Sequence, residues 1–98
     1  MVQINWTDQA KQDLKSISDY ISIDSVKYAK LQIVRLRSKT KILKNHLRAG
    51  RMVPEYEDES IRELIEGRYR IVYRLVSDSR IDILTVHHSS KDFSNFQV

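Results

Sequence analysis

The sequence has 98 residues, the length of one small domain, so we predict that residues 1–98 form a single unit. Hydrophobic residues make up 41% and charged residues 31%, which excludes an intrinsically disordered chain. The absence of cysteine excludes disulfides and thiolate chemistry. The formal net charge of +4 favours an anionic partner, either nucleic acid or an acidic protein, but a soluble domain with a basic surface has the same balance.

Several classes of site are not predicted. The chain has no Gly-rich phosphate loop and no serine in the context of a nucleophile elbow. Two adjacent histidines, without cysteine or a suitably spaced carboxylate, do not form a metal site. We therefore predict no metal and no cofactor. The first residues lack the apolar run of a signal peptide, and no segment has the length and apolar character of a membrane span.

The first part of the chain predicts a strand followed by a helix. Residues Val2 to Trp6 alternate between apolar and polar side chains, as in a short half-buried strand. Thr7 is a suitable N-cap, and Asp8 places a negative charge in the first turn of a helix. One apolar face then predicts an amphipathic helix from Asp8 to about Ile23; it consists of Ala10, Leu14, Ile17 and Ile21.

A second helix is predicted to start after Asp24 and Ser25 and to end at Ala49-Gly50. Its apolar stripe consists of Val26, Ala29, Ile33, Leu36, Thr40, Leu43 and Leu47. Its outer face carries Lys27, Lys30, Arg35, Arg37, Lys39, Lys41 and Lys44. These cations either form an ordinary solvated face or bind nucleic acid or an acidic partner.

The second half of the chain predicts three strands joined by short turns. Arg51 to Ser60 is a polar connection, and strands follow at Ile61–Ile65, Tyr69–Val76 and Arg80–His88. Together the elements predict an α+β fold with an N-terminal strand, a two-helix hairpin and a three-stranded antiparallel meander. In the tail, Phe93 and Phe96 are expected to cover an exposed edge of the core.

The central predicted strand has two different faces. Ile71, Tyr73 and Leu75 share one face, and Arg70, Val72 and Arg74 share the other. Arginines on a half-buried strand must be paired or must line a wet cleft. Glu63 and Asp82 on the neighbouring strands are the candidate partners, and a functional cleft is the alternative.

Three residues have the chemistry of a metal-free RNA-cleaving site. His87 and His88 point to opposite faces of the last strand, so only one of them shares a face with Arg70. A histidine there could donate a proton to a leaving group, while Arg70 stabilises the charge that develops on phosphorus. Glu55 either neutralises Arg51 or Arg62 or, if it reaches the face of Arg70, acts as a general base. We take Glu55, Arg70 and His88 as the candidate catalytic set.

Taken in order along the chain, the segments described above resemble the ParE/RelE superfamily of toxins from bacterial type II toxin–antitoxin systems. The resemblance runs from Trp6 to Phe93. It rests on Trp6 with Ala10, Asp13, Leu14, Ile17 and Tyr20-Ile21, on Gly50-Arg51 with Pro54-Glu55, on Ile61-Arg62-Glu63-Leu64, on Tyr69 to Arg74, on Ile83 to Val86, and on His88 with Lys91-Asp92. The segments around Gly50 and Ile61 are more similar to the ParE branch.

The resemblance implies a cytoplasmic toxin that arrests growth and is held inactive by a cognate antitoxin in a hetero-oligomer, without contact with a membrane. ParE-like members inhibit DNA gyrase and are not nucleases, whereas RelE-like members cleave messenger RNA on the translating ribosome. We favour gyrase inhibition; the alternative is a ribosome-dependent, metal-independent endoribonuclease. A degenerate toxin or a plain interaction module on the same fold is the remaining interpretation.

The family residues carry over unevenly. Glu55, Arg70 and His88 match or lie close to residues that RNA-cleaving relatives use. The C-terminal tyrosine of many nuclease members is absent, because Ser89-Ser90 stand at that point, and Lys91 replaces a more common arginine of the ParE-like ending. Contacts with nucleic acid or another target are assigned to Arg51, Arg62, Arg74, Lys91 and Phe93. Whether the protein is an enzyme stays open from the sequence.

Overall fold

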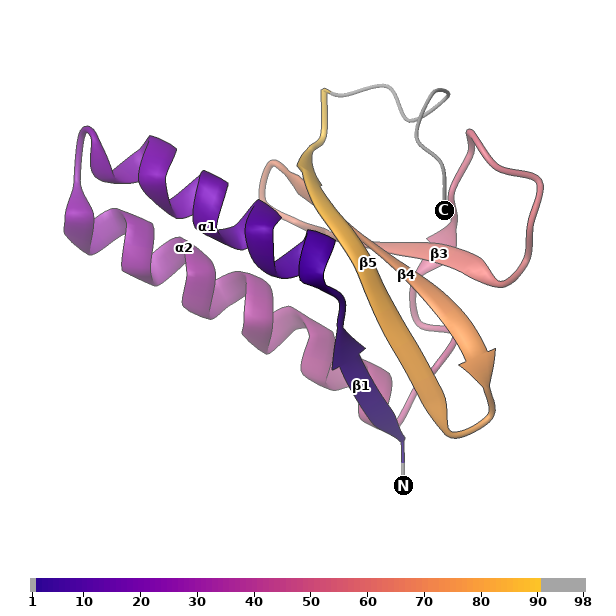
Figure 1. Ribbon diagram of the computed structural model, residues 1–98. Coiled ribbons are helices and arrows are strands. Elements are labelled where there is room, and N and C mark those ends of the chain that lie inside the picture. Colours follow the sequence, from indigo (N-terminus) through magenta and orange to yellow (C-terminus); the bar gives the residue numbers. More distant parts are fainter. Residues whose placement is uncertain (1, 91–98) are drawn as a thin grey trace.

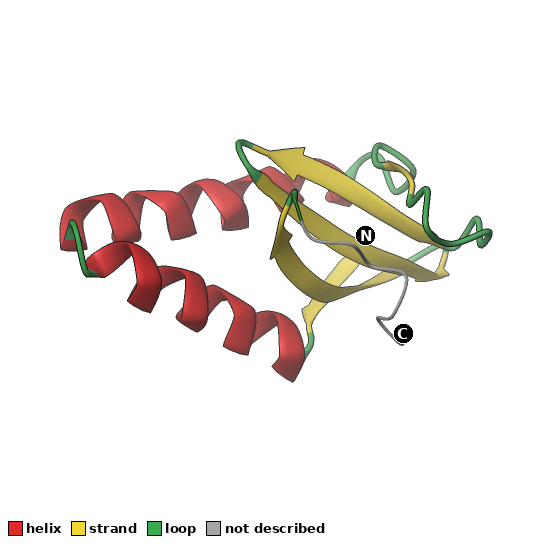
Figure 2. Cartoon of the chain, turned by 90° about the horizontal axis from the view of Figure 1, so that it is seen from above, coloured by secondary structure: helices red, strands yellow, loops and turns green. Residues whose placement is uncertain are grey.

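A computed structural model of the protein describes residues 2–90, in which a helical hairpin packs on one face of a five-stranded sheet (Figures 1 and 2). In chain order the elements are β1 (Gln3–Trp6), α1 (Asp8–Ser22), α2 (Val26–Lys39), the 3₁₀-helix η1 (Thr40–Lys44), β2 (Arg51–Met52), β3 (Ile61–Glu66), β4 (Tyr69–Ser77) and β5 (Arg80–His88). The predicted α+β architecture, with its N-terminal strand, helical hairpin and meander, is confirmed.

The sheet has the strand order β1-β5-β4-β3-β2 and is mixed. Strands β3, β4 and β5 form the predicted antiparallel meander. Strand β1 is the edge strand next to β5 and runs parallel to it, with Gln3 opposite Arg80 and Trp6 opposite Ile83. Strand β2 was not predicted; it pairs antiparallel with β3 through two residues, too few to give a periodic pattern in the sequence.

Both helices begin at the predicted N-caps. The Thr7 hydroxyl accepts a hydrogen bond from the Ala10 N–H at 3.2 Å and donates one to the Ile83 carbonyl at 2.7 Å. The same side chain therefore starts α1 and attaches it to β5. The Ser25 hydroxyl accepts from the Tyr28 N–H at 3.0 Å and starts α2 in the same way.

The second helix is shorter than predicted. It was expected to continue to Ala49, but α2 ends at Lys39 and the chain tightens into η1. At the junction, the Thr40 hydroxyl donates to the Arg37 carbonyl at 2.7 Å, and the β-branched Thr40 side chain is buried. The tighter 3₁₀ turn still places Leu43 in the core, so the apolar spacing of the sequence did not reveal the change.

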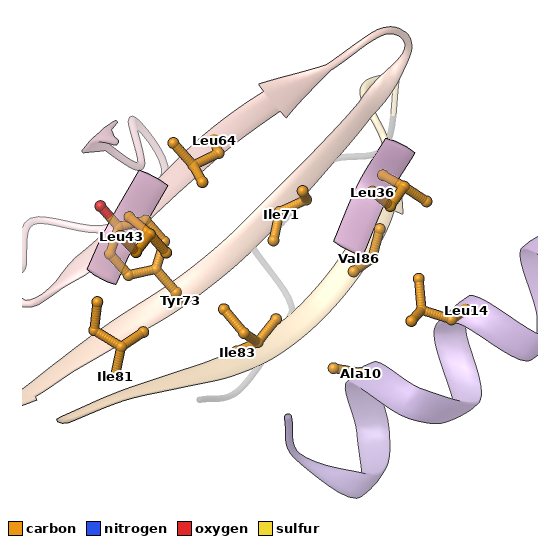
Figure 3. Packing of buried hydrophobic residues seen from close by; sticks show 10 residues of the cluster. All are labelled: Ala10, Leu14, Leu36, Leu43, Leu64, Ile71, Tyr73, Ile81, Ile83 and Val86. Atoms are coloured by element: carbon orange, nitrogen blue, oxygen red, sulfur yellow. The ribbon is translucent and has the colours of Figure 1, made fainter. Parts of the chain in front are cut away.

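The main core lies between the helices and the sheet (Figure 3). Ala10 and Leu14 of α1 and Leu36 of α2 pack against Ile71 and Val86 of the sheet and their neighbours. The opposite face of the sheet has a second, smaller apolar cluster of Val53, Ile61 and Val72, with Tyr56 and Leu84 against it. Both faces of the sheet are therefore partly covered, which explains why β4 has apolar residues on both sides.

Two polar contacts attach α1 to the middle of β5. The Asp13 carboxylate accepts hydrogen bonds from the Thr85 hydroxyl and from the Val86 N–H. Because Asp13 lies one turn before Ile17 on the half-buried side of α1, these bonds define how the helix sits on the sheet. The expectation for Phe93 and Phe96 falls outside the described residues.

Gly50 lies where the chain packs closely against the sheet. Its N–H donates to the Tyr73 hydroxyl at 2.9 Å, and that hydroxyl donates to the Leu47 carbonyl at 3.0 Å. A Cβ on residue 50 would lie 2.5 Å from the Glu63 carbonyl oxygen and 2.7 Å from the Tyr73 ring. Only glycine fits there, because both neighbours are held in the core.

We expect Gly50→Ala to lower the free energy of unfolding by about 1–3 kcal/mol, because the added methyl overpacks a site between a backbone oxygen and a buried ring. Gly67→Asn is the control: Gly67 has φ +58° and open space around it, and asparagine tolerates this left-handed conformation. Urea denaturation measures both variants. Equal losses in the two would contradict the close approach at Gly50.

Burial raises the pKa of Tyr73 above its ordinary value, so the folded protein favours the neutral phenol. The stabilisation from the neutral Tyr73 phenol is complete below about pH 10. It is lost as the pH rises further, because the phenol ionises at a lower pH in the unfolded chain than in the folded protein. We expect Tyr73→Phe to cost about 1–3 kcal/mol at neutral pH by leaving the Gly50 N–H without its acceptor. Its stability should also fall less steeply above pH 10, as measured by urea denaturation across that range.

Candidate functional site

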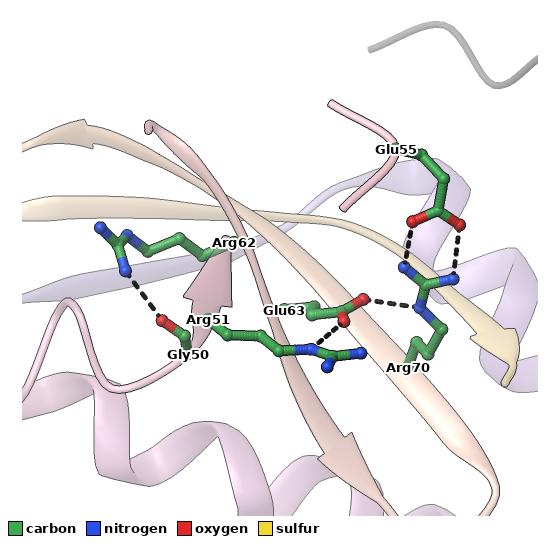
Figure 4. Close-up of polar contacts among 6 residues, drawn as sticks. All are labelled: Gly50, Arg51, Glu55, Arg62, Glu63 and Arg70. Carbon is green, nitrogen blue, oxygen red and sulfur yellow. Dashed lines mark hydrogen bonds and ion pairs between the residues drawn. The ribbon is translucent and has the colours of Figure 1, made fainter. Parts of the chain in front are cut away.

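A buried carboxylate, Glu63, is the centre of the polar site on the sheet face away from the helices (Figure 4). Strand β3 places it opposite Val72 of β4 and opposite Arg51 of β2. One oxygen accepts from Arg70 Nε at 2.6 Å, and the other accepts from Arg51 Nε at 2.6 Å. The Glu63 side chain is completely buried, so these two guanidinium groups supply the charge compensation that water would otherwise provide.

Arg70 in turn connects Glu63 to the loop between β2 and β3. Its two terminal nitrogens donate to the two oxygens of Glu55, each at 2.8 Å, in the bidentate geometry that arginine favours with carboxylates. These hydrogen bonds raise the pKa of Arg70 above its ordinary value, against the opposing effect of burial. We call Arg51, Glu55, Glu63 and Arg70 the Arg70 network.

The Arg70 network decides between the pairings that the sequence left open. Arg70 pairs with Glu63, as one interpretation predicted. Glu55 pairs with Arg70, not with Arg51 or Arg62. Opposite Arg74, the Asp82 carboxylate is ion-paired with Arg80 at 3.0 Å, so the expected partner of Arg74 is engaged elsewhere.

The other predicted contact residues are spread over the molecule. Arg62 donates to the carbonyl of Gly50 at 2.9 Å and to that of Glu59 at 3.2 Å, so it holds the loop before β3 in place. Arg51 is the most exposed member of the Arg70 network, with 63% of its side chain accessible. Lys91 and Phe93 lie outside the described residues.

His88 does not join Glu55 and Arg70. It is opposite Tyr69 in the β4–β5 register, on the face covered by the helices, and its ring meets the Tyr69 ring edge-on at 5.7 Å. Its Nδ1 lies 2.8 Å from the Ser90 hydroxyl. His88 lines an open groove of about 1060 Å³ between the helical hairpin and the β3–β4 turn, together with Tyr20 and Tyr28.

His87 is the histidine that lies opposite Arg70. The sequence contained a signal for this pairing: a two-residue turn at Asp78-Ser79 between Ser77 and Arg80 places residue 87 opposite residue 70. Two irregularities, one extra residue on each strand, shift the register in the middle of the hairpin and then restore it. The sequence-based prediction assigned the catalytic role to His88 because of its position near the end of the strand.

The ion pairs around Arg70 limit the chemistry that this site can perform. Glu55 and Arg70 are side by side, but each neutralises the charge of the other. Arg70 also forms an ion pair with Glu63. A guanidinium that donates at least three of its N–H groups to carboxylates is a structural cation in this state. Among the described residues, no group of three or more His, Asp or Glu side chains is arranged to hold a metal ion.

A family model described as the ParE toxin of the type II toxin–antitoxin system parDE matches residues 4–93, most of the chain. The chain belongs to this family. It is a toxin of the ParE/RelE superfamily, as the resemblance in its sequence implied. Comparison with curated proteins found no match.

Solved structures show the same fold. A chain of the chromosomal ParDE system from P. aeruginosa superposes with a TM-score of 0.73 at 25% identity, covering 90% of this chain and 96% of that one. The RelBE2 toxin–antitoxin complex from Mycobacterium tuberculosis gives 0.54 at 22% identity, with coverage of 89% and 96%. The YoeB-YefM complex from Staphylococcus aureus gives 0.55 at 17%, with coverage of 90% and 97%. The last two support the fold alone.

Within residues 2–90, neither helix combines the length and the apolar character needed to cross a bilayer.

We expect Glu63→Ala to lower the free energy of unfolding by about 3–5 kcal/mol, because it leaves buried Arg70 without one of its carboxylates. Arg51→Ala is the matched comparison in the same network. It removes an arginine whose side chain is mostly exposed, so water can replace it beside Glu63 while Arg70 stays paired, and the loss should be smaller, about 1–3 kcal/mol. Urea denaturation distinguishes the two, and equal small losses would show that Glu63 does not organise this face.

Proposed function

We propose that this toxin arrests growth by inhibiting DNA gyrase, as ParE-like members of its superfamily do. The observation that carries the proposal is the engagement of Arg70 by Glu55 and Glu63. An RNA-cleaving site needs a guanidinium aimed at phosphate and a carboxylate available as a base, and here the two groups compensate each other. The family match to ParE toxins supports the same target.

The second candidate, a ribosome-dependent mRNA endonuclease, has one specific observation in its favour. His87 lies opposite Arg70 in the β4–β5 register, and Glu55 contacts Arg70. An RNA phosphate that displaced Glu55 from Arg70 would meet a base, a cation and an imidazole. His88 would then have no role, because it lies on the face covered by the helices.

We also propose a cognate antitoxin as the regulatory partner. The three similar solved chains come from systems described as toxin–antitoxin pairs or complexes. The groove between the hairpin and the β3–β4 turn is large enough to receive a segment of such a partner. Apolar side chains are exposed near it, including Tyr20 at 75% and Tyr28 at 52%. Coverage by an antitoxin helix would remove this apolar surface from water. The complex would be cytoplasmic.

The test separates the two targets with histidine variants. We expect the wild-type toxin and the variants His87→Ala and His88→Ala to inhibit purified gyrase equally in a supercoiling assay, and none to cut mRNA on translating ribosomes. A nuclease would instead lose about a hundredfold or more in cleavage rate when its acid is removed. Ribosome-dependent cleavage that only His87→Ala abolishes would overturn the gyrase proposal in favour of the second candidate.

Variants of Arg70 would not separate the two functions. Arg70 is 6% exposed and bridges two carboxylates, so Arg70→Ala removes a structural ion-pair partner. Loss of toxicity in that variant would follow from unfolding under either function. The histidine variants avoid this problem because His88 is exposed and His87 is half-buried.

The C-terminal residues Lys91 and Phe93 are proposed as contacts with gyrase. We expect Lys91→Ala combined with Phe93→Ala to weaken gyrase inhibition about tenfold, the effect of losing roughly 1.4 kcal/mol at an interface. Ser89→Ala combined with Ser90→Ala is the control in the adjacent segment. Inhibition that is unchanged in the first double variant would show that these residues do not contact the target.

A further inference from the structure

Charge is divided unevenly along the chain. Residues 25–54 contain nine of the 17 Lys and Arg residues and none of the 13 Asp and Glu residues, which gives the segment a net charge of +9. The remaining eight cations and 13 acids leave the rest of the chain at −5. The modest total of +4 therefore conceals a strongly basic region, which comprises α2, η1 and the connection to β2.

The cations of α2 and η1 gather on one side. At 3.6 residues per turn, five of them fall within about a third of the helix circumference. They form what we call the basic stripe: Lys27, Lys30, Arg37, Lys41 and Lys44. All five are exposed. The stripe extends over roughly 30 Å, from the rise of an α-helix followed by a 3₁₀-helix.

The basic stripe is not compensated within residues 2–90. The ion pairs there join Arg51 and Arg70 to Glu63, Arg70 to Glu55, and Arg80 to Asp82, so none involves a cation of the stripe. Arg37 has one neighbour of note, because its guanidinium lies 5.3 Å from the centre of the Trp6 ring, which holds its position without neutralising its charge. Figure 1 shows α2 along the outer side of the molecule, with β1 beside its C-terminal end.

We propose that the basic stripe binds the phosphate backbone of duplex DNA. Five cations along one side of α2 and η1 suit a ligand with closely spaced negative charges, and each contacted phosphate releases condensed counterions. The stripe contains no aromatic side chain on which an unpaired base could stack, so it does not have the character of a single-strand site. The choice of duplex DNA over folded RNA rests on the proposed function, since gyrase holds duplex DNA.

Lysine and arginine contacts of this kind bind without reading sequence. The stripe would therefore add affinity for DNA already held by gyrase, on the face of the toxin opposite to the Arg70 network. Its effect would be to concentrate the toxin at its target. This contact differs from the gyrase contacts proposed for Lys91 and Phe93, which concern the enzyme itself.

The test is the binding of the full chain to a fluorescent 20-bp duplex, followed by anisotropy at several salt concentrations. We expect log K to fall linearly with log salt, and the double variant Lys30→Gln/Lys41→Gln to reduce that slope by about 1.8, or roughly 0.9 for each lost phosphate contact. The matched control is Lys11→Gln/Lys15→Gln, which removes the same charge from exposed positions on α1. Circular dichroism verifies that both variants are folded.

Three outcomes would overturn the inference. The first is an equal loss of slope in the two double variants, which would assign binding to net charge instead of the stripe. The second is equal affinity of the toxin for polyglutamate, which would indicate an acidic protein partner. The third is tight binding to a folded RNA hairpin without binding to the duplex.

A supercoiling assay with the same variants separates this inference from the proposed function. Inhibition of gyrase by a toxin that does not bind the duplex would reject the stripe alone. Binding of the duplex through the stripe without any inhibition of gyrase would reject the proposed target while the DNA site stands.

Discussion

The carboxylate of Glu63 is the constraint on which one whole face of this toxin depends. It is completely buried on the central part of the sheet, where an uncompensated charge would be very unfavourable. Two arginines from flanking strands compensate it, and the second of these, Arg70, extends the compensation to Glu55 in the loop after β2. The same loop contributes Val53 and Tyr56 to the smaller apolar cluster, so charge and packing together determine its path.

This arrangement explains how residues typical of a nuclease occur in a protein for which we propose another activity. A glutamate, an arginine and a histidine on one face have the right chemistry, but two of them are held in a buried and neutral network. The ParE/RelE fold supports more than one mechanism, so the site and not the fold must carry the functional argument. In this chain the ion pairs of Arg70 favour a structural role for that residue, and we assign binding to the exposed surfaces.

The two sides of the molecule treat charge in opposite ways. Around Arg70, cations and carboxylates are paired at 2.6–2.8 Å and mostly buried. Along α2 and η1, cations are exposed, and residues 25–54 contain no Asp or Glu. Pairing within a buried network stabilises the fold only when every member is satisfied, whereas exposed cations cost little and remain available to a partner. This division is consistent with a small toxin that acts by binding to larger partners.

The sequence by itself determined the elements whose signals are local. The hydroxyls of Thr7 and Ser25 marked the helix starts, and the β-branched and aromatic residues of Tyr69–Ser77 marked the central strand. Tertiary structure decided what depends on distant neighbours. The ending of α2 at Lys39 follows from packing around Thr40, and the pairing of β1 with β5 joins residues far apart in the chain.

The candidate site divides in the same way. The alternation along β4 was enough to place Arg70 and Arg74 on one face and to nominate Glu63 as a partner. The choice of Glu55 as the second partner required a loop to fold back over the sheet, which no periodic pattern encodes. The choice between His87 and His88 depended on a strand register, and a shift of one residue exchanges the two faces of the sheet. Periodicity reports which residues share a face, but only the folded chain reports which groups meet across it.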